Sequence, residues 1–504
     1  MKLAINANVF TVIILLLCGF IGFFWRNHWA ALVFDHLDWF AADVQKIHAH
    51  QPVPLRKGEP LILPEYFSTE GKLQSTKLFL SETGLLGLVV LNNGQLVYER
   101  YKPGKNHRDL FYSWSMAKSI TSVLVGFAIE EGYIHSVKDP VSVYLPEFSD
   151  HLFGQASVED LLTMSSGVDF NENYSDPKSD VLQLFLSIKN DQSSFLKTLS
   201  RQPLNSLNEP FLAGQYNQYV SSDTQVLTMI LQRVLPMPIS KYLELKLWKP
   251  AGMESPAYWL ADKTGMVAGF CCLKTSTRDM ARLGQIMLQR GIYQGTPIIP
   301  ANWINQSLDT TPIRLQAGKQ PWSRSTWAYG YQWWMPPSID KTNQMLMNDF
   351  LAVGVFYQFL FISPKHNIVI TRHSAAPDYL FNNQGMRHID FFNRIITQIN
   401  ASWRALTSPD GQCLSVNKES TGDARPITLA KCDGSIRQSW WVNKGLLHSR
   451  NGGCAIARNN TDLEHKEPFK AHQAILHHYV LGACDRPKAL SGSQLIDEWQ
   501  LKGS

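Results

Sequence analysis

The chain has 504 residues, more than one ordinary domain needs, so its length predicts two or three folded units. Its hydrophobic fraction of 44% is that of a globular protein with a large core. The formal net charge is only +5, with basic and acidic residues interspersed and no lysine–arginine block, which argues against a nucleic acid as partner.

The first predicted element is an apolar run from Val9 to Trp25, preceded by Lys2. It is at the short end for a membrane-spanning helix, which takes about 17–25 apolar residues. A cleavable signal peptide has a shorter apolar core and a small-x-small cleavage site, and no such site follows Phe24. We therefore predict that residues 1–30 form an uncleaved membrane anchor, with a cleaved signal peptide and a buried cytosolic helix as alternatives.

The first two interpretations both place the rest of the chain outside the cytosol. It would face the periplasm from the inner membrane, or be periplasmic or secreted if the segment is cleaved. Residues 31–64 are charged and contain prolines, which predicts a stalk or linker. The residue composition changes again near Ser408-Pro409-Asp410-Gly411, where a turn-rich segment with cysteines begins. We therefore expect one folded domain over residues 65–404 and a second, small all-β domain over 405–504.

Residues 85–100 predict a β-hairpin, because Asn93-Gly94 between two apolar runs is a strong hairpin signal. A helix is expected from Ser115 to Glu131, with Gly132 as its stop. A second helix opens at Ser157-Val158-Glu159-Asp160, and residues 155–310 look mostly helical and loop-like.

The pattern returns to strands at Tyr329–Met335, Phe356–Ile362 and Asn367–Thr371. Strands at both ends with helices between them predict an α+β domain with an inserted all-helical lobe. Within the strand pattern, Phe356 and Tyr357 are candidates for the core of the sheet.

The cysteines fall into two groups. Cys271 and Cys272 are adjacent, and we expect two buried thiols because neighbouring cysteines rarely bridge without strain. Four more lie in the last hundred residues and allow three pairings, which indicates a local disulfide framework in an oxidising compartment. These four are Cys413, Cys432, Cys454 and Cys484.

Ser115 and Lys118 carry the most informative chemistry. A serine hydroxyl is a weak nucleophile until a base takes its proton. On a helix that begins at Ser115, the Lys118 amine lies one turn further along the same face. The helix N-terminus offers a backbone N–H and a positive dipole end to an oxyanion. The amine must be partly neutral to act as the base, and burial lowers the pKa of a lysine.

Ser-x-x-Lys alone is a weak signal, since it occurs five times in the chain. Only the copy at Ser115 follows an aromatic extended stretch and begins a long apolar helix. The alternative interpretation is an N-cap serine beside a solvated lysine. No Gly-x-Ser-x-Gly or His-Glu-x-x-His pattern is present, and the histidines lack ligand spacing. We therefore expect neither a metal nor another cofactor.

Two segments together, Trp114–Lys118 and Val158–Gly167, resemble the β-lactamase superfamily, and most closely its class C branch and the 6-aminohexanoate-dimer hydrolases. Further matching segments follow in the order of the family, over about residues 80–400. These further segments are Tyr219–Leu227, Leu247–Glu254, Thr277–Gly284 and Tyr329–Trp334. The resemblance implies an antiparallel sheet flanked by helices.

The resemblance also implies roles. Ser115 would attack the carbonyl carbon and become acylated, and Tyr219 would share acid and base work with Lys118. Ser221 would hydrogen-bond Lys118 or the substrate. Gly354 would allow close approach of the substrate, and the N–H of Val355 would complete the oxyanion hole with that of Ser115.

Ala352-Val353-Gly354 stands where β-lactamases carry Lys-Thr-Gly. The missing lysine argues against penicillins and D-Ala-D-Ala peptides, so the predicted function is a serine hydrolase of amide or ester bonds in a small substrate. One alternative is a penicillin-type D-Ala peptidase or β-lactamase. The other is a non-catalytic envelope protein that binds glycans or muropeptides.

The C-terminal segment resembles a ricin-type β-trefoil lectin with about two of its three repeats visible. Gln438-Ser439-Trp440 matches the core motif of one repeat, for which the resemblance implies a Cys413–Cys432 bridge. A second repeat starts at Cys454 and implies pairing with Cys484. Sugar-binding members usually carry Asp where Ser415 stands, which favours a structural role over glycan binding.

Overall fold

The computed structural model describes residues 42–176, 178–189, 212–215, 217–310, 327–336, 349–376, 385–407, 411–417, 425–443, 446–457 and 479–482. Residue contacts divide the chain into unit 1, residues 1–56 with 84–383, and unit 2, residues 57–83 with 384–504. No helix among the described residues is long and apolar enough to span a bilayer, and the predicted anchor of residues 1–30 lies outside them.

Unit 1 is built on a seven-stranded antiparallel sheet with the order β11-β12-β13-β14-β15-β4-β5. The strands are β4 (Leu85–Asn92), β5 (Gln95–Tyr101), β11 (Ala328–Tyr329), β12 (Trp334–Met335), β13 (Phe350–Gly354), β14 (Gln358–Ser363) and β15 (Ile368–Ser374). The predicted hairpin is confirmed as β4–β5. Its turn residues Asn93 and Gly94 have φ of 50° and 74°, which a two-residue hairpin turn of this kind requires.

A second sheet of unit 1 has the order β1-β7-β8-β6. Its strands are β1 (Asp43–Ile47), β6 (Leu110–Tyr112), β7 (Ala257–Ala261) and β8 (Leu273–Ser276), and a small hairpin pairs β9 (Ile292–Tyr293) with β10 (Thr296–Pro297). The middle of the chain is therefore less helical than expected. Residues 43–47 belong to this sheet, so that part of the expected stalk is folded.

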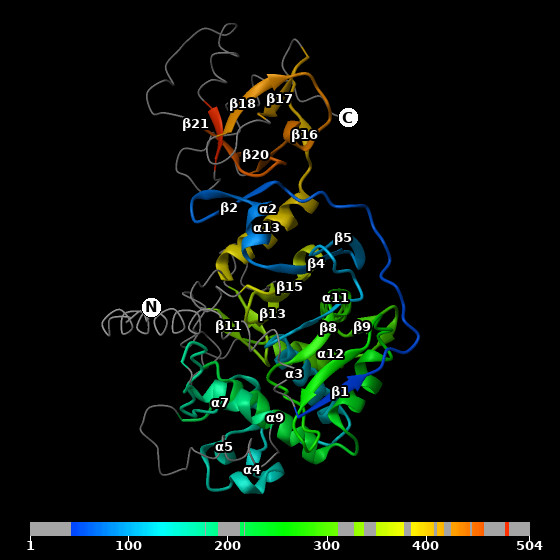
Figure 1. Cartoon of the computed structure of the whole chain (residues 1–504), viewed down its shortest axis with the longest axis vertical. Helices are drawn as coiled ribbons and strands as arrows, with labels where there is room; N and C mark the ends of the chain where they lie inside the picture. The colour runs from blue at the N-terminus through cyan, green and yellow to red at the C-terminus, as the bar shows by residue number, and fades with distance from the viewer. Residues whose placement is uncertain are drawn as a thin grey trace, which may run out of the picture. The chain divides into compact units, whose positions relative to one another are not determined.

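The two predicted helices, from Ser115 to Glu131 and from Ser157 onward, are both present in unit 1. The described helices of unit 1 are α3 (Met116–Glu130), α4 (Val141–Tyr144), α5 (Leu152–Gln155), α6 (Val158–Leu162), α7 (Asp180–Ser187), α9 (Ser221–Val234), α10 (Ile239–Leu243), α11 (Thr277–Leu288) and α12 (Ala301–Leu308), with short turns η2 (Pro146–Phe148), η4 (Glu244–Trp248) and η6 (Pro364–His366). In Figure 1, α4, α5, α7 and α9 gather at one end of unit 1, away from β4 and β15.

Local signals set the ends of two of these helices. Gly132, with φ of 74°, follows the end of α3 as predicted. Ser157 caps α6 in a capping box with Asp160. Helix α11 packs against the sheet at Gly284, where an added Cβ would lie 2.7 Å from the Leu360 side chain. The glycine therefore sets how closely this helix approaches β14.

Unit 2 contains β2 (Tyr66–Thr69), β3 (Lys72–Ser75), α2 (Thr76–Glu82) and α13 (Gly385–Asn400). Its larger sheet has the order β16-β19-β20-β21-β22-β18-β17. These strands are β16 (Arg404–Ala405), β17 (Cys413–Val416), β18 (Arg425–Ala430), β19 (Ser439–Asn443), β20 (Leu446–Ser449), β21 (Cys454–Ala457) and β22 (Tyr479–Gly482), with the turn η8 (Ile436–Gln438) before β19.

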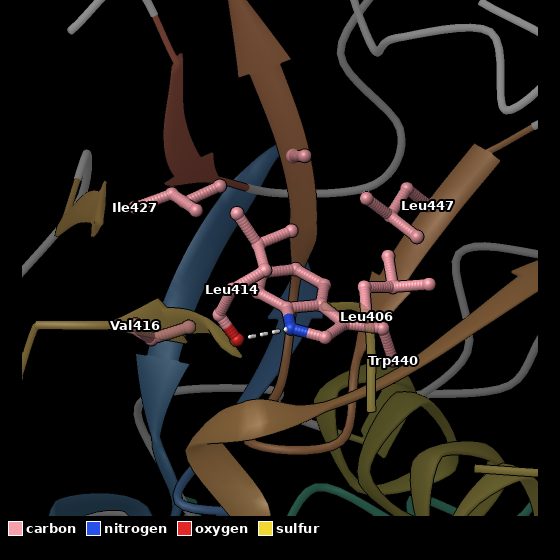
Figure 2. Packing of buried hydrophobic residues seen from close by; sticks show 7 residues of the cluster. Leu406, Leu414, Val416, Ile427, Trp440 and Leu447 are labelled. Carbon is pink, nitrogen blue, oxygen red and sulfur yellow. Dashed lines mark hydrogen bonds between the residues drawn. The ribbon is translucent and has the colours of Figure 1, made fainter. Parts of the chain in front are cut away.

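Trp440 lies in the apolar core of this sheet, as expected for the Gln-x-Trp motif. Figure 2 shows its indole among Leu406, Leu414 and Leu447, and Nε1 donates to the Leu414 carbonyl at 2.8 Å. The predicted Cys413–Cys432 disulfide is present. Cys454 is also disulfide-bonded, and its predicted partner Cys484 lies outside the described residues.

Candidate active site

A sharp turn places Ser115 at the start of α3. Ser113 N donates to the Leu273 carbonyl at 2.8 Å, which extends the pairing of β6 with β8 by one residue. Trp114 then has φ of 49°, in the left-handed region that non-glycine residues rarely adopt. Ser115 follows as the N-cap of α3, and its hydroxyl makes no capping hydrogen bond. The turn thus presents the hydroxyl at the helix N-terminus without committing it to the helix backbone.

Lys118 lies within hydrogen-bonding distance of this hydroxyl. Its Nζ is 2.9 Å from Ser115 Oγ and donates to the Phe270 carbonyl at 2.8 Å. Lys118 is only 2% exposed, on a helix that is buried on nearly every side. Ser115 does stand at the N-cap position, as in the alternative interpretation, but its hydroxyl makes no capping bond. The lysine is buried, so the solvated lysine of that interpretation is wrong.

Burial changes the protonation of Lys118. It lowers the pKa of the amine to about 7, and the Glu172 carboxylate opposes the shift. A neutral amine and an ammonium are then both well populated near neutral pH. This is the protonation behaviour expected of a general base.

Tyr219 is positioned by a loop that is tied to the end of α6. Asn217 Nδ2 donates to the Thr163 carbonyl at 2.8 Å, and Gln218 N donates to the Met164 carbonyl at 2.7 Å. These bonds tie the residues just before Tyr219–Leu227 to the Val158–Gly167 segment, and both segments resemble the superfamily. They bring Tyr219 next to the start of α9, beside the lysine.

The Tyr219 ring lies against Lys118, whose Nζ is 5.0 Å from the ring centroid. The Tyr219 ring also stacks on the Trp334 ring, with 5.4 Å between the ring centroids, and it contacts the Tyr329 ring edge-on, with 6.1 Å between the centroids. Tyr219 is 6% exposed. The structure therefore brings together the three side chains predicted to be catalytic, Ser115, Lys118 and Tyr219.

Ser221 has a different partner from the one expected. Its hydroxyl donates to Glu172 Oε1 at 2.5 Å, and its backbone N–H donates to Oε2 at 2.8 Å. Within the described part of the chain, no hydrogen bond joins Ser221 to Lys118. Ser221 instead fixes the carboxylate that acts on the lysine charge. Its predicted contact with substrate stays a prediction.

Gly354 lies close to the turn that carries the nucleophile. An added Cβ would lie 2.7 Å from the Ser113 carbonyl oxygen and 3.0 Å from the Trp114 Cβ. Only glycine permits this approach, and it sets the end of β13 beside the start of α3. Val355 follows directly and is buried. Phe356 and Tyr357 form the turn between β13 and β14, although the sequence pattern had predicted a strand there.

Cys271 and Cys272 are joined by a disulfide, so the expectation of two buried thiols is wrong. Both residues are buried, and they follow Phe270, whose carbonyl accepts from Lys118. Adjacent residues can form such a bond only with an unusual backbone, and Cys272 has φ of 71°.

Three contributors to the site were missed in the sequence. Glu172 is far from Ser221 along the chain and belongs to no motif, so no spacing signal could have found it. The Phe270 carbonyl is a backbone group, and any residue type can supply it. Trp334, by contrast, lies in the Tyr329–Trp334 segment that resembles the superfamily and could have been proposed.

The chain matches a family model over most of the described unit 1. Residues 80–388 match the family described as Beta-lactamase. A curated relative, the 6-aminohexanoate-dimer hydrolase of Paenarthrobacter ureafaciens, is 26% identical over 333 residues, which are 64% of this chain and 81% of the relative.

Solved structures show the same fold. A candidate 6-aminohexanoate-dimer hydrolase from Bacillus anthracis superposes with a TM-score of 0.63 at 24% identity, covering 74% of this chain and 96% of that one. A candidate beta-lactamase from Bacteroides dorei DSM 17855 gives a TM-score of 0.50 at 15% identity, covering 64% and 96% of the two chains. Both agree with an α+β architecture of antiparallel sheets and helices.

Proposed function

The chain belongs to the beta-lactamase family of serine hydrolases, and from this premise we propose that it cleaves amide or ester bonds of a small substrate through an acyl-enzyme on Ser115. One observation carries the proposal. The buried amine of Lys118, with a pKa of about 7, lies 2.9 Å from the Ser115 hydroxyl. This arrangement supplies both the nucleophile and the base that activates it.

In the first step, neutral Lys118 takes the Ser115 proton while Oγ bonds to the substrate carbonyl carbon. The carbonyl oxygen then carries a negative charge. We propose that the backbone N–H groups of Ser115 and Val355 stabilise it, since the former opens α3 and the latter follows Gly354 beside it. Collapse of this intermediate breaks the amide or ester bond and leaves an acyl group on Ser115.

The leaving amine or alcohol needs a proton, and water must later be deprotonated to remove the acyl group. We propose that Tyr219 shares these transfers with Lys118, because its ring lies against the amine. Glu172 favours the charged form of the lysine and would stabilise the ammonium that forms during attack. Ser221 holds this carboxylate in place.

The proposed substrate class follows from Ala352. It is buried on β13 and supplies no cation at the place where β-lactamases carry the lysine of Lys-Thr-Gly. A substrate carboxylate would lose that partner, so we propose esters and linear amides over penicillins. The name of the Paenarthrobacter ureafaciens relative, a 6-aminohexanoate-dimer hydrolase, is consistent with a linear amide. A penicillin-type D-Ala peptidase or β-lactamase is the alternative.

Labelling with a fluorophosphonate probe tests the acyl-enzyme directly. We expect the wild-type chain to form an adduct and Ser115→Ala to form none, because the probe reacts with an activated serine. Ser415→Ala is a matched control, since Ser415 also begins a Ser-x-x-Lys pattern but lies on β17. Absence of an adduct in both the wild type and Ser115→Ala would favour the non-catalytic envelope protein that binds glycans or muropeptides.

Substrate preference tests the reading of Ala352. We expect p-nitrophenyl butyrate to be hydrolysed with a kcat/KM at least about 10²-fold above that of benzylpenicillin, since a missing charged partner costs a few kcal/mol. Ala352→Lys should reduce the ratio of the kcat/KM for p-nitrophenyl butyrate to that for benzylpenicillin. Comparable hydrolysis of the two compounds by the wild type would support the penicillin-type alternative.

We further propose that the chain works outside the cytosol, held at the inner membrane by residues 1–30 and facing the periplasm. The Cys413–Cys432 disulfide supports an oxidising compartment. Alkaline extraction of membranes distinguishes an anchor, which stays in the pellet, from a cleaved signal, which leaves a soluble chain.

For the C-terminal segment we propose a ricin-type repeat with a structural role. The burial of Trp440 and its bond to Leu414 support a role of the Gln-x-Trp motif in the core. Glycan binding is the alternative. Retention of the chain on immobilised galactose or N-acetylglucosamine would favour it over the structural role.

A further inference from the structure

The turn between β13 and β14 is held in an unusual conformation. Three residues, Val355, Phe356 and Tyr357, connect the paired residues Gly354 and Gln358. Phe356 and Tyr357 each have φ of 63°. A bulky residue in this region is strained, and it persists only where the surroundings fix it. Two in succession therefore require a specific restraint.

The Gln358 side chain provides contacts of that kind. One N–H of its Nε2 is shared between the carbonyls of Val355 and Phe356, both at 3.2 Å. The same amide group donates to the Ser374 carbonyl at 2.6 Å, and Oε1 accepts from Ser374 N at 3.0 Å. Gln358 is fully buried, so water does not compete for these bonds.

These contacts continue the sheet beyond its last backbone pair. The register of β14 with β15 ends at Phe359 and Arg372, and the Gln358 amide then satisfies both backbone groups of Ser374. The turn is thereby tied to β15, a central strand of the sheet. The first residue of the β13–β14 turn is Val355. The residue before it, Gly354, lets this end of β13 lie close to the turn that precedes Ser115.

From this geometry we infer that Gln358 is a positioning residue for the oxyanion hole: it locks the β13–β14 turn so that the Val355 N–H keeps a fixed direction. The inference rests on the proposed function, which assigns that N–H to the developing oxyanion. Gln358 itself does not contact the reacting atoms. Its loss should weaken binding of the tetrahedral state far more than binding of the substrate.

The test compares Gln358→Leu with Gln438→Leu in the full chain. Gln438 is a matched control, because it is 2% exposed and its amide also links two backbone groups. Its Nε2 donates to the Lys431 carbonyl at 2.8 Å and its Oε1 accepts from Asp433 N at 2.7 Å, in unit 2. Both variants therefore lose the bonds of a side-chain amide to backbone groups.

With p-nitrophenyl butyrate, we expect Gln358→Leu to lower kcat by about 10–100-fold with KM within about threefold, since a whole oxyanion donor is worth about 10²–10³. The Kd of phenylboronic acid, which forms a tetrahedral adduct with an active serine, should rise by a similar factor. Gln438→Leu should change each value by less than about threefold. If Gln358→Leu changes kcat and the boronate Kd no more than Gln438→Leu does, the inference is overturned.

Two further measurements keep the test decisive. Gln358→Glu retains the shape and the acceptor for Ser374 N, and it replaces the leucine variant if that one fails to fold. Amide hydrogen exchange over residues 355–357 reports on the lock without any activity. Faster exchange in the Gln358 variant supports the lock, and unchanged exchange rules it out. If the wild type is inactive but exchange over residues 355–357 is still faster in the Gln358 variant, the result counts against the proposed function and not against the positioning role of Gln358.

Discussion

Replacing Lys118 with alanine should lower the rate of Ser115 acylation by about 10²–10⁴-fold, the usual range for a positioned proton acceptor. The reason is the 2.9 Å separation of Nζ from Ser115 Oγ, with the lysine side chain itself buried. The measurement is the burst or single-turnover rate with a p-nitrophenyl ester. Lys105→Ala is the control, since Lys105 forms an exposed ion pair with Asp109 that is worth little.

The pH dependence of the wild-type acylation rate is a second test of Lys118 as the base. Because the pKa of Lys118 is lowered to about 7, the fraction of neutral amine rises from low to high as the pH passes from 6 to 8. The acylation rate should rise with it and then level off. A wild-type rate that is flat over this range, or a Lys118→Ala variant close to wild type, would remove Lys118 from the role of base.

Replacing Tyr219 with phenylalanine should also cost orders of magnitude in acylation, about 10²-fold or more, because the change removes only the hydroxyl that we propose as a proton carrier. The ring would keep its stacking on Trp334. Little change is therefore expected in the thermal midpoint or in KM, and the loss should appear in kcat.

Tyr242→Phe is the control for Tyr219→Phe. Tyr242 is equally buried, and its hydroxyl donates to Glu131 at 2.6 Å outside the site. It should lose stability of about 1 kcal/mol and keep the catalytic rate. A Tyr219→Phe enzyme as fast as Tyr242→Phe would show that the phenol takes no part in proton transfer.

Features set by neighbouring residues were predictable from the sequence. Asn93-Gly94 gave the β4–β5 hairpin because the backbone of that turn needs positive φ at both positions. The relation of Ser115 to Lys118 was predictable because a spacing of three residues on a helix fixes it. The capping box at Ser157 was equally local.

Features that depend on distant parts of the chain were not predictable. Strands β7 and β8 escaped the pattern because they are short, mostly buried and paired with β1 and β6 from much earlier in the chain. Phe356 and Tyr357 look like strand residues since aromatic side chains favour strands. The turn to β14 overrides that preference. Glu172 could be recognised as part of the site only in the folded structure, where it accepts a hydrogen bond from Ser221.

The burial of Lys118 has a consequence for the folding equilibrium. The unfolded chain holds a proton on this amine up to about pH 10.5, whereas the native chain releases it near pH 7. Native stability should therefore increase with pH between these values, and below pH 7 the buried lysine opposes folding by roughly 5 kcal/mol, at about 1.4 kcal/mol per pH unit. Lys118→Met, which fills about the same volume without a charge, should melt at a higher temperature while losing as much of the acylation rate as Lys118→Ala.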